Sequence, residues 1–219
     1  MALTALAHVS GQQAIEINGV LRNTYIMLGL SIGFAALVSY VAMALGIGMM
    51  NFFIYLIGFF GLSYAVQKTA NSVWGLFWSF VFAGFIGLFI APILGFYLAV
   101  QPWLVVQAFA LTSATFFALS AYTIVRRTDF SWLSSFLVVS FFVILGIILL
   151  SFFVNMSPFA IVISMFVVVV ACALILWQTS AIVLGGERNY IVAANQLFVS
   201  FYLLFINILQ LIGIFGGDD

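Results

Sequence analysis

The chain has 219 residues, of which 67% are hydrophobic and 5% are charged, and its formal net charge is zero. A soluble domain carries roughly 25% charged residues, so this composition excludes a soluble fold and indicates an integral membrane protein. The apolar runs are too long and too continuous for the alternating strands of a membrane barrel. We therefore predict an all-α polytopic membrane protein. The zero net charge argues against nucleic acid as a partner.

Residues 1–22 differ in composition from the rest of the chain. They lack a basic start, and the short apolar run at residues 5–7 is followed by His8, which is unlike a signal peptide. Gly11, Gln12 and Gln13 favour a loosely ordered segment, with an amphipathic turn around residues 15–20. We predict that residues 1–22 form a cytoplasmic N-terminal tail.

Charged residues divide the rest of the chain into uncharged runs. The length of each run gives the number of membrane spans that it can hold. The uncharged runs hold 45 residues after Arg22, 57 after Lys68, 57 after Asp129 and 29 after Arg188. A spanning helix needs about 20 residues, so the runs hold two, two, two and one helices. Turn-forming residues interrupt the three longer runs at 46–48, 101–102 and 155–158. The seven predicted spans are 24–45, 50–67, 73–98, 104–125, 131–154, 159–183 and 190–215.

Seven spans place every Lys and Arg of the chain on one side of the membrane. This side carries Arg22 and a charge cluster made of Lys68, Arg126, Arg127, Glu187 and Arg188. Positive loops stay in the cytoplasm, so we predict a cytoplasmic N-terminus and a C-terminus on the outer face. The transmembrane domain then covers residues 23–216, and 217–219 form a short extracytoplasmic end. An even number of spans would destroy this sorting of charge.

The last predicted span carries a polar stripe on one helical face. Its positions recur at steps of three and four: Gln196, Ser200, Leu203, Asn207 and Gln210. Lipid offers these polar groups no hydrogen-bond partners, so we expect this helix to lie inside a bundle. Hydrogen bonding between helices is the preferred interpretation, and a polar path or sensor is the alternative.

Two further positions within the spans stand out. Gln178, near the end of the sixth span, has an amide to satisfy, and we predict a structural hydrogen bond to Ser200 at a similar depth. Pro92 removes a hydrogen bond from the third span and should kink it, so it is either a packing feature or a hinge. Gly84, Gly87, Ala91 and Gly95 share one face of that span, which predicts close helix packing.

Catalytic constellations are missing from the sequence. The one histidine, His8, lies in the predicted tail, and no Asp or Glu falls within any predicted span. A serine–histidine dyad, an intramembrane aspartyl pair, a zinc motif and a Gly-rich phosphate loop are therefore all excluded. We predict that the protein is not an enzyme and uses no cofactor or metal.

Several segments, taken together in their order and spacing, resemble the Bax inhibitor-1 family. They are Val20-Leu21-Arg22-Asn23-Thr24-Tyr25, residues 84–92, Leu119-Ser120-Ala121-Tyr122, Gly185-Gly186-Glu187-Arg188-Asn189-Tyr190-Ile191 and Leu211-Ile212-Gly213. The chain is most similar to the bacterial YccA-like branch of this family. The resemblance implies seven helices, with the last one central and two groups of three wrapped round it.

The resemblance also implies two alternative functions. YccA-like proteins are inner-membrane modulators of the membrane-anchored protease FtsH, which would make the lipid bilayer and FtsH the partners. Other bacterial members are described as pH-sensitive calcium leaks that titrate an acidic pair in the sixth and seventh helices. That pair matches Gln178 and Ser200 here, and neither residue titrates near neutral pH. We therefore expect an FtsH modulator, with calcium as a partner only under the alternative.

Overall fold

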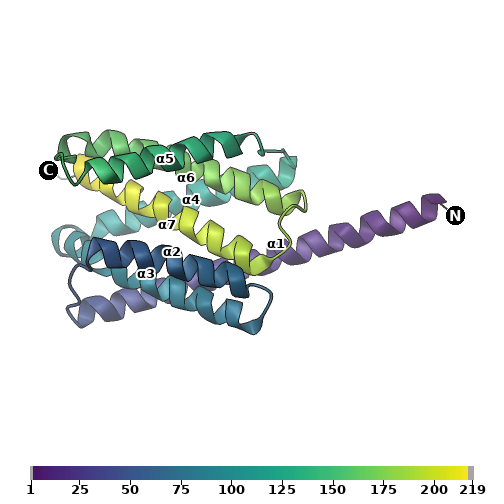
Figure 1. Cartoon of the computed structure of the whole chain (residues 1–219), viewed down its shortest axis with the longest axis horizontal. Coiled ribbons are helices and arrows are strands. Elements are labelled where there is room, and N and C mark those ends of the chain that lie inside the picture. Colours follow the sequence, from purple (N-terminus) through teal and green to yellow (C-terminus); the bar gives the residue numbers. More distant parts are fainter. Residues whose placement is uncertain (1, 217–219) are drawn as a thin grey trace. The chain divides into compact units, whose positions relative to one another are not determined.

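The computed structural model of the protein describes residues 2–216, with side chains from residue 15 onward. Over this range the secondary structure is helical. The elements are α1 (Ala2–Ala44), α2 (Phe52–Thr69), α3 (Val73–Val100), α4 (Pro102–Arg126), α5 (Leu133–Leu150), a short 3-10 turn (Ser157–Phe159), α6 (Ala160–Val183) and α7 (Tyr190–Phe215). Figure 1 labels the helices along the chain. The predicted C-terminal end, 217–219, lies outside the described residues.

Six helices in the described part of the chain are long and apolar enough to cross a membrane, which identifies a multi-pass membrane protein. They are α3 to α7, with α6 taken together with its preceding turn, and the part of α1 from Ile15 to Ala44. The predicted all-α class is thereby confirmed. The remaining helix, α2, has 18 residues and ends in the polar sequence Gln67-Lys68-Thr69, so its apolar part is short for a span.

The loosely ordered N-terminal tail is a wrong prediction, because α1 is one helix from Ala2 to Ala44 with no break at residue 22. In Figure 1 this helix continues as the purple segment toward the N-terminus. Once a helix is nucleated in an apolar span, each added residue gains a hydrogen bond without a new nucleus. Isolated glycines such as Gly11 and Gly19 cost only about 1 kcal/mol each, and no proline interrupts the segment.

The chain divides into two compact units. Unit one consists of Met1–Pro92 and Ala181–Phe198, and unit two of Ile93–Ser180 and Val199–Asp219. The first division falls directly after Pro92, inside α3. Each unit therefore contains complete helices together with parts of α3, α6 and α7.

Unit one is built around the close approach of α1 and α3. A Cβ atom on Gly87 would collide with the backbone carbonyl of Ala35, and one on Gly84 would come within 3.1 Å of the Phe34 ring. Gly84, Gly87 and Ala91 are buried, as the predicted small-residue face requires. On the other side of α3, the Tyr55 ring of α2 stacks on Phe89 with the ring centroids 3.7 Å apart.

Unit two packs aromatic side chains of α4 against the second half of α7. The Phe201 ring makes edge contacts with Phe109 and Phe116, at centroid separations of 5.9 and 5.6 Å. A Cβ atom on Gly213 would overlap the Tyr97 ring, so the end of α7 lies directly against α3. The α5 helix ends at Leu150, four residues before the predicted end of that span, and residues 151–153 form a turn.

Candidate functional site

A buried hydrogen bond joins α6 to α7 within unit two. Ser200 Oγ donates to Gln178 Oε1 over 2.9 Å, and the two side chains are 0% and 7% exposed. The predicted partnership of Gln178 and Ser200 is therefore confirmed. It arises because both residues are polar positions at matching depth on helices that are consecutive in the chain.

The chemistry open to this pair is limited to neutral hydrogen bonding. An amide and a hydroxyl keep the same charge across the physiological pH range. Neither supplies the charged oxygen that a divalent cation requires most. Their match to the family's acidic pair stays a prediction, and their geometry is that of a bond between neighbouring helices.

The other residues of the polar stripe differ in their burial and in their bonding. Asn207 Nδ2 donates to the carbonyl of Leu203, one turn earlier in the same helix, over 2.8 Å. Gln196, which belongs to unit one, and Gln210, which belongs to unit two, are each half-buried. Asn195 is 7% exposed and more buried than Gln196 beside it, although it lies off the predicted stripe. Bonding between helices is thus established for Ser200.

Ser180 is a structural residue that the sequence analysis missed. Its hydroxyl donates to the carbonyl of Thr128 and accepts from the backbone N–H of Phe130, both over 3.1 Å. These two bonds hold the α4–α5 loop against the end of α6 in unit two. The neighbouring Thr179 is fully buried, and its hydroxyl has no partner among the described residues. The run of three polar residues at the end of an apolar helix was the available indication.

Asn189 has a similar role in unit one. Its Oδ1 accepts from the backbone N–H groups of Ile191 and Val192, over 2.9 and 3.3 Å, which is the geometry of a helix N-cap. Its Nδ2 donates to the carbonyl of Ala70 over 3.0 Å and to Asn71 Oδ1 over 2.8 Å. One side chain therefore caps α7 and fastens the α6–α7 loop to the α2–α3 loop.

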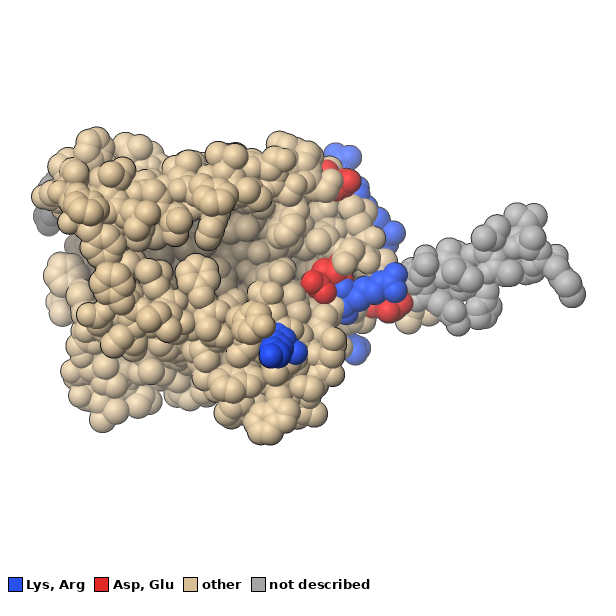
Figure 2. All heavy atoms as spheres, in the orientation of Figure 1, with Lys and Arg blue, Asp and Glu red and all other residues tan. Residues whose placement is uncertain are grey.

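The residues of the predicted charge cluster belong partly to unit one and partly to unit two. In unit one, Lys68 lies in the last turn of α2, and Glu187 and Arg188 lie in the loop that Asn189 holds to the α2–α3 connection. In unit two, Arg126 ends α4 and Arg127 follows it in a left-handed conformation with φ 49°. Figure 2 colours these basic and acidic side chains.

Pro92 lies inside α3, which continues through it as a helix. The side chain is half-buried, and the division between the two units follows directly after it. Its role as a hinge stays a prediction.

Metal coordination has no evident site in the part of the chain whose side chains are described. No three His, Cys, Asp or Glu side chains come together there as they would around an ion. A pocket with both charged and apolar lining lies between α1 and the α6–α7 loop of unit one.

Comparison with known proteins shows which family the sequence matches. The family model described as "Inhibitor of apoptosis-promoting Bax1" matches residues 17–217. An uncharacterized protein of Pseudomonas aeruginosa is 47% identical over 206 residues, which cover 93% of each chain. The "Modulator of FtsH protease YccA" of Escherichia coli strain K12 and the "Inner membrane protein YccA" of Escherichia coli O6:H1 are each 34% identical over 200 residues, covering 91% of each chain.

Proposed function

Because the chain belongs to the Bax inhibitor-1 family, we propose that it is a non-enzymatic inner-membrane regulator that binds and modulates a membrane-anchored FtsH protease. The observation that carries this proposal is its similarity to the modulator of FtsH protease YccA of Escherichia coli, which extends over 91% of both chains. The inner-membrane location rests on the relative that is named for it.

The proposed topology has seven spans, with α2 as the seventh and with α7 at the centre of the bundle. If α2 did not cross, Arg22 and Arg126 would lie on opposite faces of the membrane, against the positive-inside rule. The central position of α7 is supported by its burial: 56% of its most apolar window is buried, compared with at most 39% for the other candidate spans. The N-terminus is then cytoplasmic and the C-terminus periplasmic.

This topology places the first part of α1 where a cytoplasmic protease can engage it. A bundle of apolar helices costs much free energy to remove from the bilayer, since its apolar side chains would be transferred from lipid to water. A protease bound to the N-terminal segment would remain occupied by a substrate that it releases slowly. That occupancy is the physical basis that we propose for modulation.

Deletion of residues 2–18 tests the N-terminal segment as the handle. We expect the truncated protein to have a longer lifetime in cells with active FtsH, while its thermal unfolding in detergent changes little. The control is the same pair of proteins in cells whose FtsH is proteolytically inactive, where the lifetimes should be equal. An unchanged lifetime with active FtsH would contradict the handle. Failure of the full chain to co-purify with FtsH would contradict the proposed function itself.

The alternative calcium leak lacks support in the chain, because α2 to α7 contain no Asp or Glu and the pair at the matching positions is neutral. Calcium flux into liposomes at about pH 6 and about pH 8 provides the test. We expect no pH-dependent flux from the unmodified protein. The variant Gln178→Asp/Ser200→Asp should acquire pH dependence, because two adjacent carboxyl groups share protons and titrate as a pair. Strongly pH-dependent flux from the unmodified protein would reverse this preference.

A further inference from the structure

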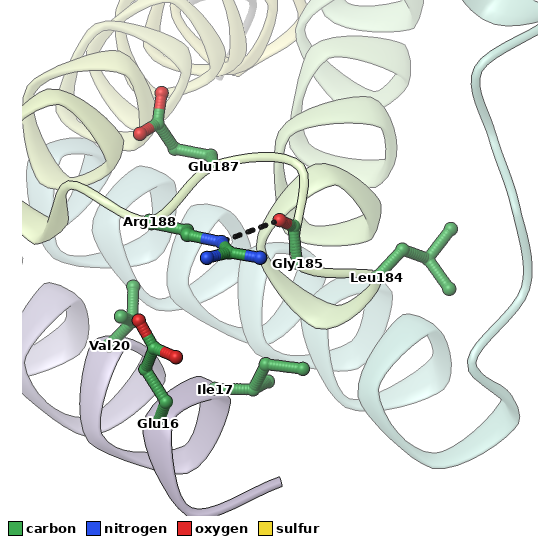
Figure 3. Close-up of a pocket in the computed structure, with 7 residues that line it drawn as sticks. All are labelled: Glu16, Ile17, Val20, Leu184, Gly185, Glu187 and Arg188. Atoms are coloured by element: carbon green, nitrogen blue, oxygen red, sulfur yellow. Dashed lines mark hydrogen bonds between the residues drawn. The ribbon is translucent and has the colours of Figure 1, made fainter. Parts of the chain in front are cut away.

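A pocket of about 150 Å³ opens between α1 and the α6–α7 loop in unit one. Figure 3 shows Glu16, Ile17 and Val20 on α1 on one side of it and Gly185 and Arg188 on the other, with Leu184 and Glu187 at its edges. The volume equals that of protein cavities that accept a molecule the size of benzene. Apolar side chains and both signs of charge meet in this one pocket.

The pocket lies at the level where α1 leaves the apolar layer of the membrane. Residues 23–44 are uncharged and span about 33 Å of helix, close to the thickness of a hydrocarbon core of about 30 Å. Val20 and Ile17 then lie about 3 and 8 Å beyond Arg22, within a headgroup layer about 5–8 Å thick on each side. Leu184 follows directly after the last residue of α6, so this helix ends at the same pocket.

The charged groups of the pocket keep much of their bonding capacity. The Arg188 guanidinium uses its Nε to donate to the carbonyl of Gly185 over 3.4 Å, and its terminal NH₂ groups have no partner among the described residues. Arg presents five donors in a fork that suits phosphate. The Glu16 carboxylate points toward the same space and forms no ion pair with Arg188 within the described part of the chain. Glu187 is engaged, since its Oε1 accepts from the backbone N–H of Asn189 over 2.8 Å.

We propose that this pocket binds a phosphate ester that carries a primary ammonium group, as in the headgroup of an ethanolamine phospholipid. The phosphate would pair with Arg188, and the ammonium would donate to Glu16. Ile17, Val20 and Leu184 would contact the start of the acyl region. A phosphate without an ammonium would leave its negative charge near Glu16 uncompensated, and a choline headgroup offers no N–H to donate.

Native mass spectrometry of the full-length protein in detergent, with synthetic lipids added in equal amounts, tests the site. We expect phosphatidylethanolamine to be retained over phosphatidylcholine and phosphatidylglycerol. Arg188→Gln should lower retention of phosphatidylethanolamine about tenfold, since a charge-assisted hydrogen bond contributes that much or more. Arg188→Lys should restore part of it. Glu16→Gln should abolish the preference over phosphatidylcholine, and Arg126→Gln, at the end of α4 in unit two, is the matched control that should change nothing.

Free phosphoethanolamine distinguishes the two sources of this chemistry. If it fails to displace the lipid at a comparable concentration, the membrane lipid is the ligand; if it displaces it, the site takes the soluble ester. Equal retention of the three lipids by the unmodified protein would overturn the proposal, as would unchanged retention by Arg188→Gln. If Arg188→Gln does not fold, Glu16→Gln decides, and an unchanged lipid preference then overturns the proposal.

Discussion

Ser200 and Gln178 form a hydrogen bond at a depth where neither side chain can turn to water for a partner. Removing Ser200 takes this bond from the buried amide of Gln178, whereas removing both residues exchanges the bond for apolar contact. This asymmetry makes the bond measurable even though bonds between membrane helices are weak on average.

We predict that Gln178→Leu lowers the free energy of unfolding in detergent by about 0.6 kcal/mol, a typical value for a hydrogen bond between membrane helices. Combining it with Ser200→Ala should recover most of that loss. Thr112→Val is the matched control: Thr112 is also buried, but its hydroxyl donates within its own helix, to the carbonyl of Ala108, so no bond between helices is broken. A double variant as unstable as the sum of the single variants would contradict a direct structural bond.

A single substitution can separate the two functions of Asn189, which are to cap α7 and to bond to the α2–α3 loop. Asn189→Asp keeps the oxygen that caps α7 and loses the donor to Ala70 and Asn71, whereas Asn189→Ala loses both functions. We expect the Asp variant to accelerate amide hydrogen exchange at residues 70–73 and to leave the first turn of α7 protected. The Ala variant should accelerate exchange both at residues 70–73 and in the first turn of α7, and lose about 0.5–2 kcal/mol of stability.

The control for this comparison is Asn51→Ala at the start of α2. Asn51 also accepts from a backbone N–H, that of Phe53 over 2.9 Å, and within the described part of the chain its side chain bonds to no other loop. Its loss should therefore affect α2 without changing exchange at residues 70–73. If amide exchange at residues 70–73 is the same in Asn189→Asp as in the unmodified protein, Asn189 does not fasten the α6–α7 loop to the α2–α3 loop.

Single residues differed in how far they could be predicted. Gln178 and Ser200 are polar positions on regular helices, so helical periodicity specifies their depth and their facing sides. Ser180 and Asn189 bond to backbone groups of loops that are distant in sequence, and the path of a loop is not encoded by periodicity. The cap function of Asn189 could have been predicted from its position before α7, but its contact with Ala70 could not.

At the scale of helices, the uncharged runs predicted α7 at its exact bounds and α2 to α6 within a few residues. The first helix was predicted to begin at residue 24 after a loosely ordered tail, whereas it begins at Ala2. Composition favours a loose segment there, but growth from an existing helix favours order. The packing of α1 on α3 followed from small residues on one face. Only the structure shows that Gly87, rather than Gly84, meets the backbone of α1.

We expect Gly87→Leu to destabilise the protein by about 1–3 kcal/mol, because the added side chain would collide with the backbone of Ala35, which cannot rotate away. The control is Gly33→Leu on α1, where nothing lies within 4 Å of the added Cβ. This control should be neutral or slightly stabilising, since leucine is the better helix former. The midpoints of thermal unfolding in detergent compare the two, and equal midpoints would contradict the close approach of α1 and α3.

For the whole molecule, charge sorting and helix composition give different answers for α2. Composition identifies six candidate spans, whereas the positions of Arg and Lys favour seven. A polar last turn lowers the average hydropathy of a helix without preventing it from crossing, because Lys68 can extend its ammonium group to the membrane surface. The sequence therefore predicted the membrane class. The number of crossings has to be measured, by finding on which side of the membrane the loops and the C-terminus lie.

A reporter that works only outside the cytoplasm should be active when fused after Asp219 and inactive when fused after Arg127. A third fusion in the α1–α2 connection, after Gly48, serves as the internal control and should behave like the fusion after Asp219. If the fusion after Asp219 reports a cytoplasmic location, the number of crossings is even and α2 does not span the membrane.

The unbroken course of α1 has a consequence for distance. From Ala2 to Arg22 the helix is about 30 Å long, whereas the same residues fully extended would reach about 70 Å. Unwinding can proceed through this segment in water, but it must stop at the bilayer, where unpaired backbone groups have no solvent. Under the proposed topology the protein thus holds about 40 Å of chain in reserve, and a partner that draws on all of it would also separate Ile17 and Val20 from the α6–α7 loop at the pocket.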